Sequence, residues 1–194
     1  MKAREGGRRE EILSAVVRYI LRHGVSDLSL RPLADATGTR ARLLIYHFGS
    51  KEALIVEAMT HIRRRAQQSF LEATEGLQPL TPGGLARRFW AWATDRKNAG
   101  VARLFFEVHG LALQSPRKYA SYSRESAATW RKMVAQALPR RFRPKRREAI
   151  ATALVGALDG LLLDYLSTGD LERTTLALNL LADEIDRLVE RRRK

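Results

Sequence analysis

Residues 29–52 read SLRPLADATGTRARLLIYHFGSKE and carry the start and stop signals of several short helices. Ser29 is a typical N-cap residue, and Pro32 falls in the first turn of the helix that follows, where a missing backbone N–H costs nothing. Gly38 ends this helix, and a second one starts almost at once and runs to Gly49. The pattern predicts two short helices joined by a tight turn, followed by a long helix.

The rest of the chain also has the periodicity of helices. Apolar residues recur at spacings of three and four, and the alternation typical of strands is missing. A first helix is expected after Gly6-Gly7, with Ile12, Val16 and Ile20 on one face and Gly24 at its end. Further helices are expected at about 84–97, 100–114, 118–138, 146–168 and 171–190. The sequence therefore predicts an all-α protein of about nine helices.

The two short helices have the composition of a helix-turn-helix motif. Such a pair needs a small residue where the helices cross and a glycine at the turn, and Ala34 and Gly38 supply both. Leu30, Leu33 and Leu44 are expected to pack the pair against the first helix. The second helix of the pair is basic, and most of its side chains are unsuited to a hydrophobic core. We therefore expect this helix to be exposed.

The runs Leu30–Gly38 and Tyr46–Leu54 resemble the N-terminal signature of the TetR family of transcriptional repressors. The match is dense from Ile12 to Ile55, and the remainder resembles the family only in helix count and length. The resemblance implies a helix-turn-helix DNA-binding domain at residues 1–55. It also implies a helical domain for effector binding and dimerisation at residues 56–194.

The same resemblance makes residues 40–47 a recognition helix in the major groove of double-stranded DNA. Lys51 matches the family's phosphate-contacting lysine. Two departures bear on this: Ile45 stands where the family usually has tyrosine, and threonines flank Gly38. Thr39 either caps the recognition helix or contacts the DNA backbone, and His47 is either a backbone contact or a structural histidine. The expected DNA-binding residues are Ser29, Arg31, Thr39, Arg40, Ala41, Arg42, Tyr46, His47 and Lys51.

The second part of the chain holds most of the aromatic residues. In the TetR family the corresponding domain encloses an apolar cavity for a small effector, so we expect an apolar or amphipathic ligand with tyrosine and tryptophan tips as its polar contacts. Packing in the core is the alternative for each of these side chains. The expected effector-binding residues are Phe105, Phe106, His109, Leu113, Tyr122, Trp130 and Tyr165.

The last two predicted helices have more apolar faces than one core needs, which favours a homodimer through a four-helix bundle. One face of the last helix is expected to hold Leu171, Leu178, Leu181, Ile185 and Leu188, and Leu176 and Leu180 lie on another. Gly156 and Gly160, four residues apart, would permit a close approach of helices.

Composition narrows the class of protein. A net charge of +14 favours a polyanionic partner, although an evenly spread solubility charge is the alternative. The basic loop 139–147 and the tail 191–194 are either solvated charge or extra DNA contacts. The sequence has no cysteine, its first residues lack the apolar stretch expected of a secretory signal, and Asp159 and Asp164 interrupt its longest apolar stretch. We therefore expect a cytoplasmic protein without a membrane span.

These features together predict a ligand-responsive DNA-binding regulator, most simply a repressor that a small molecule releases from a palindromic operator. The alternative is an architectural or non-specific DNA-binding protein without an effector. No nucleophile–base pair, metal-spaced cluster or phosphate-cradling glycine loop is present, so we expect no enzyme activity, no metal and no cofactor.

Overall fold

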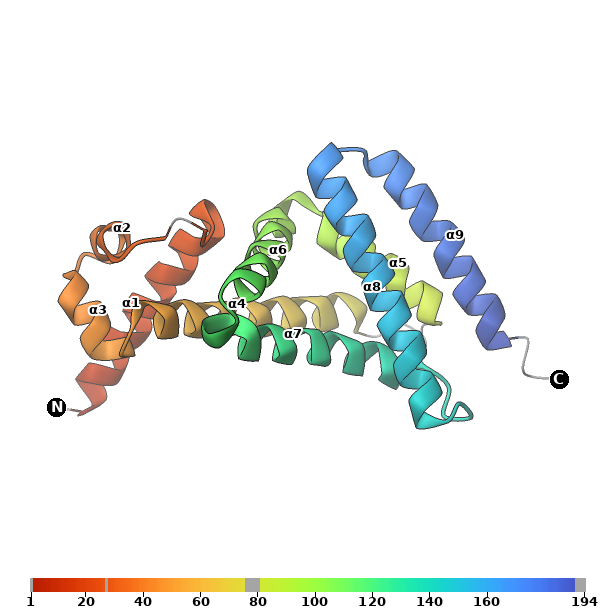
Figure 1. Ribbon diagram of the computed structural model, residues 1–194, viewed down its shortest axis with the longest axis horizontal. Coiled ribbons are helices and arrows are strands. Elements are labelled where there is room, and N and C mark those ends of the chain that lie inside the picture. The colour runs from red at the N-terminus through yellow and green to blue at the C-terminus, as the bar shows by residue number, and fades with distance from the viewer. Residues whose placement is uncertain (1, 27, 76–80, 191–194) are drawn as a thin grey trace. The chain divides into compact units, whose positions relative to one another are not determined.

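The computed structural model describes residues 2–26, 28–75 and 81–190. Within these residues all regular structure is helical, with nine α-helices, one short 3-10 helix and no strand (Figure 1). The all-α prediction is confirmed. The chain divides into two compact units, one formed by Met1–Gln68 and Arg103–Arg124, the other by Ser69–Ala102 and Glu125–Lys194. The boundary after residue 55, between a DNA-binding domain and a domain for effector binding and dimerisation, concerns function and stays a prediction.

The first unit contains α1 (Lys2–His23), α2 (Leu30–Ala36), α3 (Ala41–Phe48) and most of α4 (Lys51–Thr74), with parts of α6 (Ala99–Gln114) and α7 (Pro116–Ala137). Helix α1 begins before the expected Gly6-Gly7. Its apolar stripe is buried as expected, and so are the residues of α2, α3 and α4 that face it. Fully buried side chains include Ile12, Val16, Ile20, Leu33, Leu44, Leu54 and Ile55.

Two glycines set the turns on either side of α3. Gly38 has φ +60° between α2 and α3, and Gly49 has φ +81° between α3 and α4. Residues with a Cβ rarely adopt these angles, so the glycines fix both turns. Ser50 then caps α4, because its hydroxyl accepts a hydrogen bond from the backbone N–H of Ala53 at 3.0 Å. The predicted end of α3 and start of α4 are confirmed.

The second unit is built on α5 (Pro82–Thr94), α8 (Pro144–Thr168) and α9 (Leu171–Glu190), with the short helix η1 (Arg96–Asn98) and part of α7. Helices α8 and α9 form an antiparallel pair joined by a short turn (Figure 1). Helix α5 packs along α9, and a polar cluster fixes the pair. Arg87 of α5 donates to Asp183 at 2.5 Å and to the side-chain oxygen of Asn179 at 3.2 Å.

Several predicted boundaries in this unit are corrected. Helices α5, α7 and α8 each begin at a proline that the sequence places in a loop. The basic segment 139–147 is consequently only partly a loop, because Lys145, Arg146 and Arg147 lie in the first turns of α8. The tail 191–194 lies outside the described residues.

The buried face of α9 also differs from the expected one. Leu178 is 1% exposed, as expected, but Thr174 and Ala182 accompany it inside, while Leu171 and Leu188 are 41% and 40% exposed. Thr174 is tolerated there because its hydroxyl donates to the backbone oxygen of Asp170. Small residues let α9 approach the rest of the unit closely, and larger leucines remain at its margins.

Helix α8 is long and apolar enough to cross a membrane by length and composition alone, with a mean hydropathy of 1.6 in its most apolar window. Asp159 and Asp164 therefore do not exclude a span, contrary to our expectation. One face of α8 packs inside the second unit, where Leu154, Leu158 and Leu162 are nearly fully buried, while 28% of that apolar window as a whole is buried. The absence of a membrane partner stays a prediction.

Candidate DNA-binding surface and effector region

Helices α2 and α3 form a helix-turn-helix whose inner side is fixed by apolar packing. Leu33 and Leu44 are fully buried, and Ala34 and Phe48 are 5% and 7% exposed. Burying a leucine side chain contributes about 1.5–3 kcal/mol, so two such residues set which face of each helix points inward. The side chains of α2 and α3 that stand between these buried residues in the sequence must then face outward.

The outward face of α3 is basic and aromatic. Arg42 is exposed, Leu43 is 38% exposed and Tyr46 is 73% exposed. Arg40 is the N-cap residue of α3 and is also exposed, while Ala41 is partly buried. A large aromatic side chain held in solvent next to two arginines has no role in the core. The predicted recognition face is thus free to meet a partner.

Of the hydroxyl side chains around α2, that of Thr37 forms a hydrogen bond within the fold, whereas that of Ser29 forms no capping hydrogen bond. Thr37 donates to the backbone oxygen of Leu33 at 2.8 Å and closes the end of α2. Ser29 is the N-cap residue of α2, yet its side chain makes no capping hydrogen bond. Thr39 does not cap α3, because Arg40 occupies the N-cap position. Of the two roles considered for Thr39, only contact with the DNA backbone remains open.

Lys51 is held at the start of α4. Its ammonium group donates to the backbone oxygen of Leu28 at 3.1 Å, which places it beside the segment that leads into α2. The neighbouring Glu52 pairs instead with Lys118 at 2.9 Å. The hydrogen bond from Lys118 holds the pKa of the Glu52 carboxyl below its usual value. Lys51 forms no ion pair within the described residues, and two of its ammonium protons are left for another acceptor.

Arg9 of α1 fixes the end of the recognition helix, a role that the sequence did not reveal. Its guanidinium lies 4.6 Å from the centre of the Phe48 ring and donates to the backbone oxygen of His47 and to Glu57 of α4. The side chain of His47 packs edge-on against Tyr46 and Phe48. Nothing in the local sequence separates Arg9 from its basic neighbours.

A second unforeseen residue, Glu107 of α6, joins this helix to the end of α1. Its carboxylate accepts a hydrogen bond from the backbone N–H of Val25 at 2.7 Å. Gly24, with φ +80°, leaves the space that Glu107 occupies, since a Cβ there would lie 2.5 Å from Oε2. Charged acceptors make stronger hydrogen bonds than neutral ones, so α6 is firmly tied to the DNA-binding module.

Four of the predicted effector residues lie on α6 and one on α7 within the first unit. Phe105 packs against Phe106 and His109, and the ring of His109 bonds to the backbone oxygen of Phe105 at 2.7 Å. Tyr122 is buried, and its hydroxyl donates to the backbone oxygen of Met59 at 3.3 Å. Leu113 is 83% exposed, so the structure does not turn it inward as we expected.

The other two predicted effector residues belong to the second unit and lie in different aromatic groups. Trp130 joins a cluster with Phe70, Phe89 and Trp92, in which ring centres are 5.2–6.2 Å apart. Tyr165 instead packs on Trp90 at 6.2 Å. The sequence indicated the aromatic richness of this region but not this grouping, because α4, α5 and α7 each contribute.

Asp159 of α8 is a partly exposed residue whose carboxyl group has a strongly shifted pKa. Burial raises the pKa of its carboxyl to about 6. It lies between Val155 and Leu162 along the helix and forms no hydrogen bond or ion pair within the described part of the chain. Among the described residues no group of three His, Asp or Glu side chains is placed to hold a metal ion.

Comparison with known proteins agrees with this geometry. Residues 12–58 match the family model described as bacterial regulatory proteins, tetR family. The HTH-type transcriptional regulator BetI of Brucella anthropi is 26% identical over 182 residues, covering 92% of this chain and 91% of its own. The nicotine-responsive transcriptional repressor HdnoR of Paenarthrobacter nicotinovorans is 26% identical over 195 residues, covering 93% and 95%.

A solved structure shows the same fold over nearly the whole chain. The multidrug binding protein EbrR, crystallised with ethidium, superposes with a TM-score of 0.72 at 22% identity and covers 92% of this chain and 98% of its own. The helix-turn-helix, its exposed basic face and these likenesses define a DNA-binding transcriptional regulator. Residues 12–58 match the TetR family model, and over nearly its whole length the chain is similar to two transcriptional regulators.

Proposed function

We propose that the protein is a homodimeric, cytoplasmic repressor that binds a near-palindromic operator and leaves it when a small molecule binds. The observation that carries the DNA-binding role is the exposed face of α3, where Arg42, Leu43 and Tyr46 stand in solvent on a motif whose other face is buried. A two-fold dimer would place two such helices in successive major grooves, about 34–36 Å apart.

Two kinds of contact are assigned within this surface. Arg40 and Arg42 read bases, since an arginine fork suits the major-groove edge of guanine. Lys51 binds a phosphate together with Ser29, Arg31 and Thr39, because its charge lies beside the entry to α2. Tyr46 and His47 are placed at the DNA backbone, and Ala41 permits close approach of the helix. Base contacts specify the sequence, whereas phosphate contacts only position the protein.

The first prediction separates these roles. Arg42→Ala should relax the preference at one symmetric pair of operator positions, at a cost of about 1–3 kcal/mol for the preferred base. Lys51→Ala should weaken binding to all sequences alike and reduce the slope of log affinity against log salt by about one for each phosphate that the lysine neutralises. Binding of both variants to a randomised-site library at two salt concentrations measures both effects.

Arg65→Ala is the matched control for the removal of charge, because Arg65 is exposed on α4 outside the helix-turn-helix. It should change neither the base preference nor the salt slope. The assignment is wrong if Lys51→Ala alters base preference while Arg42→Ala and Arg40→Ala do not. Affinity of the wild type that is equal for all duplexes would favour the architectural alternative.

Support for the dimer comes from unpartnered apolar surface on α8 and α9. Leu176 and Leu180 are each 63% exposed on α9, and Leu163 of α8 is 49% exposed. A Cβ at Gly156 or Gly160 would meet no atom within 4 Å, so this side of α8 faces open space. Exposed apolar side chains on two neighbouring helices are typical of surfaces that associate between subunits.

Helix α6 supplies the physical basis for a response to a ligand. It carries Phe105, Phe106 and His109, and the same helix is bonded to the end of α1 through Glu107. A ligand that displaces α6 would change its bond to the DNA-binding module. HdnoR is described as nicotine-responsive, and EbrR was crystallised with ethidium, which supports a small-molecule effector for this chain as well.

We infer that the effector is an amphipathic cation, since the partly exposed Asp159 forms no ion pair among the described residues and a carboxylate favours a positive partner. The second prediction is that ethidium binds the protein saturably without DNA, as measured by dye fluorescence. Binding should weaken as the pH falls through about 6, because the carboxyl then becomes protonated and neutral. Asp159→Asn should lower the affinity about tenfold and remove this pH dependence.

Glu172→Gln removes the same charge from an exposed position of α9 and should leave dye binding unchanged. Trp130→Ala should also weaken binding if the aromatic cluster forms part of the site. Equal affinity of wild type and Asp159→Asn would contradict the role of the carboxylate. By linkage, dye that releases operator must bind less tightly to the operator complex.

A further inference from the structure

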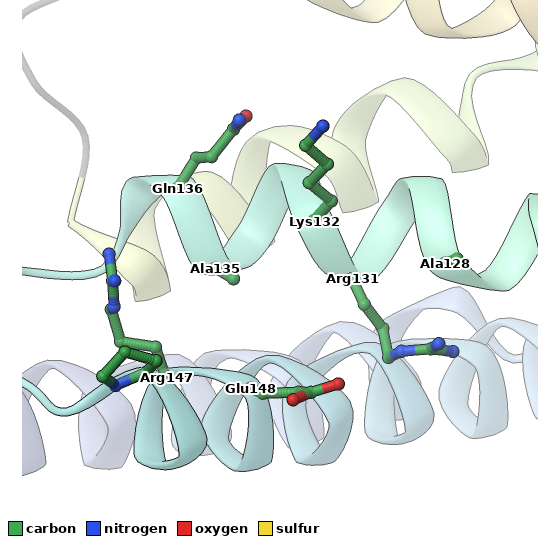
Figure 2. Close-up of a pocket in the computed structure, with 8 residues that line it drawn as sticks. Ala128, Arg131, Lys132, Ala135, Gln136, Arg147 and Glu148 are labelled. Carbon is green, nitrogen blue, oxygen red and sulfur yellow. The ribbon is translucent and has the colours of Figure 1, made fainter.

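A groove of about 360 Å³ lies between α7 and the first turns of α8, within the second unit. Arg131 and Lys132 line it from α7, and Arg147 and Glu148 line it from α8. Figure 2 shows the Arg131 side chain extending from α7 toward α8 and the Arg147 side chain extending from α8 toward α7. In this view the two guanidinium groups lie toward opposite ends of the groove, with the Glu148 carboxylate between them.

The charges of this groove are not neutralised by the protein. Arg131, Lys132, Arg147 and Glu148 form no ion pair within the described part of the chain, although other arginines of the second unit, such as Arg87 and Arg173, do. The Nε atom of Arg147 is buried and has no hydrogen-bond partner among the described residues. A buried donor without an acceptor is unfavourable, and an added acceptor would relieve it.

The start of α8 adds a second unfavourable arrangement. Helix N-termini carry partial positive charge and favour acidic residues in the first turn. Here Arg143 is the N-cap residue without a side-chain hydrogen bond, no acid lies in the first turn, and Lys145 and Arg146 follow. The Nε atom of Arg146 is also buried without a partner among the described residues. Arrangements that are unfavourable for stability, such as these, are expected at binding sites.

We propose that the groove binds a small molecule that carries a phosphate group together with a hydroxyl or amino group. Arg147, whose Nε lacks an acceptor, binds the phosphate, since the planar guanidinium fork matches its oxygens and cannot lose its charge. Arg131 adds positive charge at the other end of the groove. Glu148 accepts a hydrogen bond from the hydroxyl or amino group. The volume of the groove is that of a small-ligand site.

Glu148 is the reason to choose a small phosphate compound over the DNA backbone. A carboxylate within the groove repels a polyanion at every phosphate, whereas a compound with its own donor satisfies Glu148 and the arginines together. Binding of this kind also gives a role to the basic segment that includes Arg146 and Arg147, which the helix-turn-helix does not use.

The test is calorimetric titration of the full-length protein with ribose 5-phosphate, inorganic phosphate and ribose at constant ionic strength. Ribose 5-phosphate should bind saturably, inorganic phosphate more weakly, and ribose not at all. Arg147→Gln should lower the affinity for ribose 5-phosphate about tenfold, and Arg131→Gln should lower it by less. Glu148→Gln should weaken the binding of ribose 5-phosphate and leave the binding of inorganic phosphate unchanged or stronger.

Arg88→Gln is the matched control, because Arg88 is exposed on α5, carries the same charge and does not line the groove. An equal decrease of affinity in Arg88→Gln would reduce the effect to net charge and overturn the proposal. The absence of saturable binding by either phosphate probe would overturn it as well. Displacement of ribose 5-phosphate by non-operator duplex DNA, with weaker DNA binding in Arg131→Gln, would assign the groove to the DNA backbone instead.

Discussion

Replacing Leu176 and Leu180 together with glutamate is expected to leave the protein monomeric at micromolar concentration and to abolish binding to a two-half-site operator. Each leucine is 63% exposed on α9, so the change should not disturb the interior of the second unit. Four leucines buried in a symmetric interface, at about 1.5 kcal/mol each, would contribute roughly 6 kcal/mol to dimerisation. Introduced carboxylates would add the cost of burying unpaired charge.

Sedimentation equilibrium and operator binding measure the two consequences. Leu71→Glu is the control, because Leu71 is 50% exposed on α4 and lies outside α8 and α9. It should leave the protein dimeric. Leu178 is unsuitable for this test despite its place on α9, since it is 1% exposed and a charge there would unfold the unit. A wild-type monomer, or a dimeric double variant, would contradict the proposed interface.

The helix-turn-helix could be predicted closely because its signals are local. Gly38 and Gly49 adopt the positive φ angles that end helices, and Ser50 caps α4, so each boundary depends on one or two adjacent residues. The burial of Leu33 and Leu44 followed from their spacing. Local signals gave a wrong prediction at Pro82 and Pro144. Proline both interrupts helices and starts them, and the sequence favoured a loop where the structure begins a helix.

The functional contacts were less predictable because they join distant segments. Arg9 meets Glu57, Val25 meets Glu107, and Lys51 meets the backbone oxygen of Leu28. Periodicity indicates which face of a helix is apolar, but not which helix lies opposite. The aromatic residues illustrate the same limit, since Trp130 and Tyr165 are in separate groups although both were expected at one effector site.

These contacts also connect the two proposed activities. The recognition helix is held by Arg9 at its end and by buried leucines on its inner side, so it behaves as a rigid reading element. Helix α6 is bonded to the end of α1 through the carboxylate of Glu107 and the backbone N–H of Val25. A contact that depends on one charged acceptor has two discrete states, made or broken. That makes it a suitable element for a ligand to bias.

Gly83→Ala is expected to destabilise the second unit by about 2–4 kcal/mol, from overpacking and from weakened hydrogen bonds to a carboxylate. A Cβ at this position would collide with the backbone oxygen of Ala182 on α9 and lie 2.5 Å from Oδ2 of Asp186. It would also displace that carboxylate, which accepts hydrogen bonds from the backbone N–H of Gly83 and the hydroxyl of Thr81, both at 2.8 Å.

Thermal unfolding at fixed protein concentration measures the effect of Gly83→Ala, and Tm should fall by roughly 5–15 °C for a chain of this size. Gly110→Ala is the matched control, because a Cβ there meets no atom within 4 Å and alanine favours the helix by up to about 1 kcal/mol. Its Tm should be unchanged or higher. Because α5 supports α9, Gly83→Ala should also weaken dimerisation and operator binding, while Gly110→Ala should not affect dimerisation. If both variants raise Tm alike, the close approach of α5 and α9 does not hold the unit together.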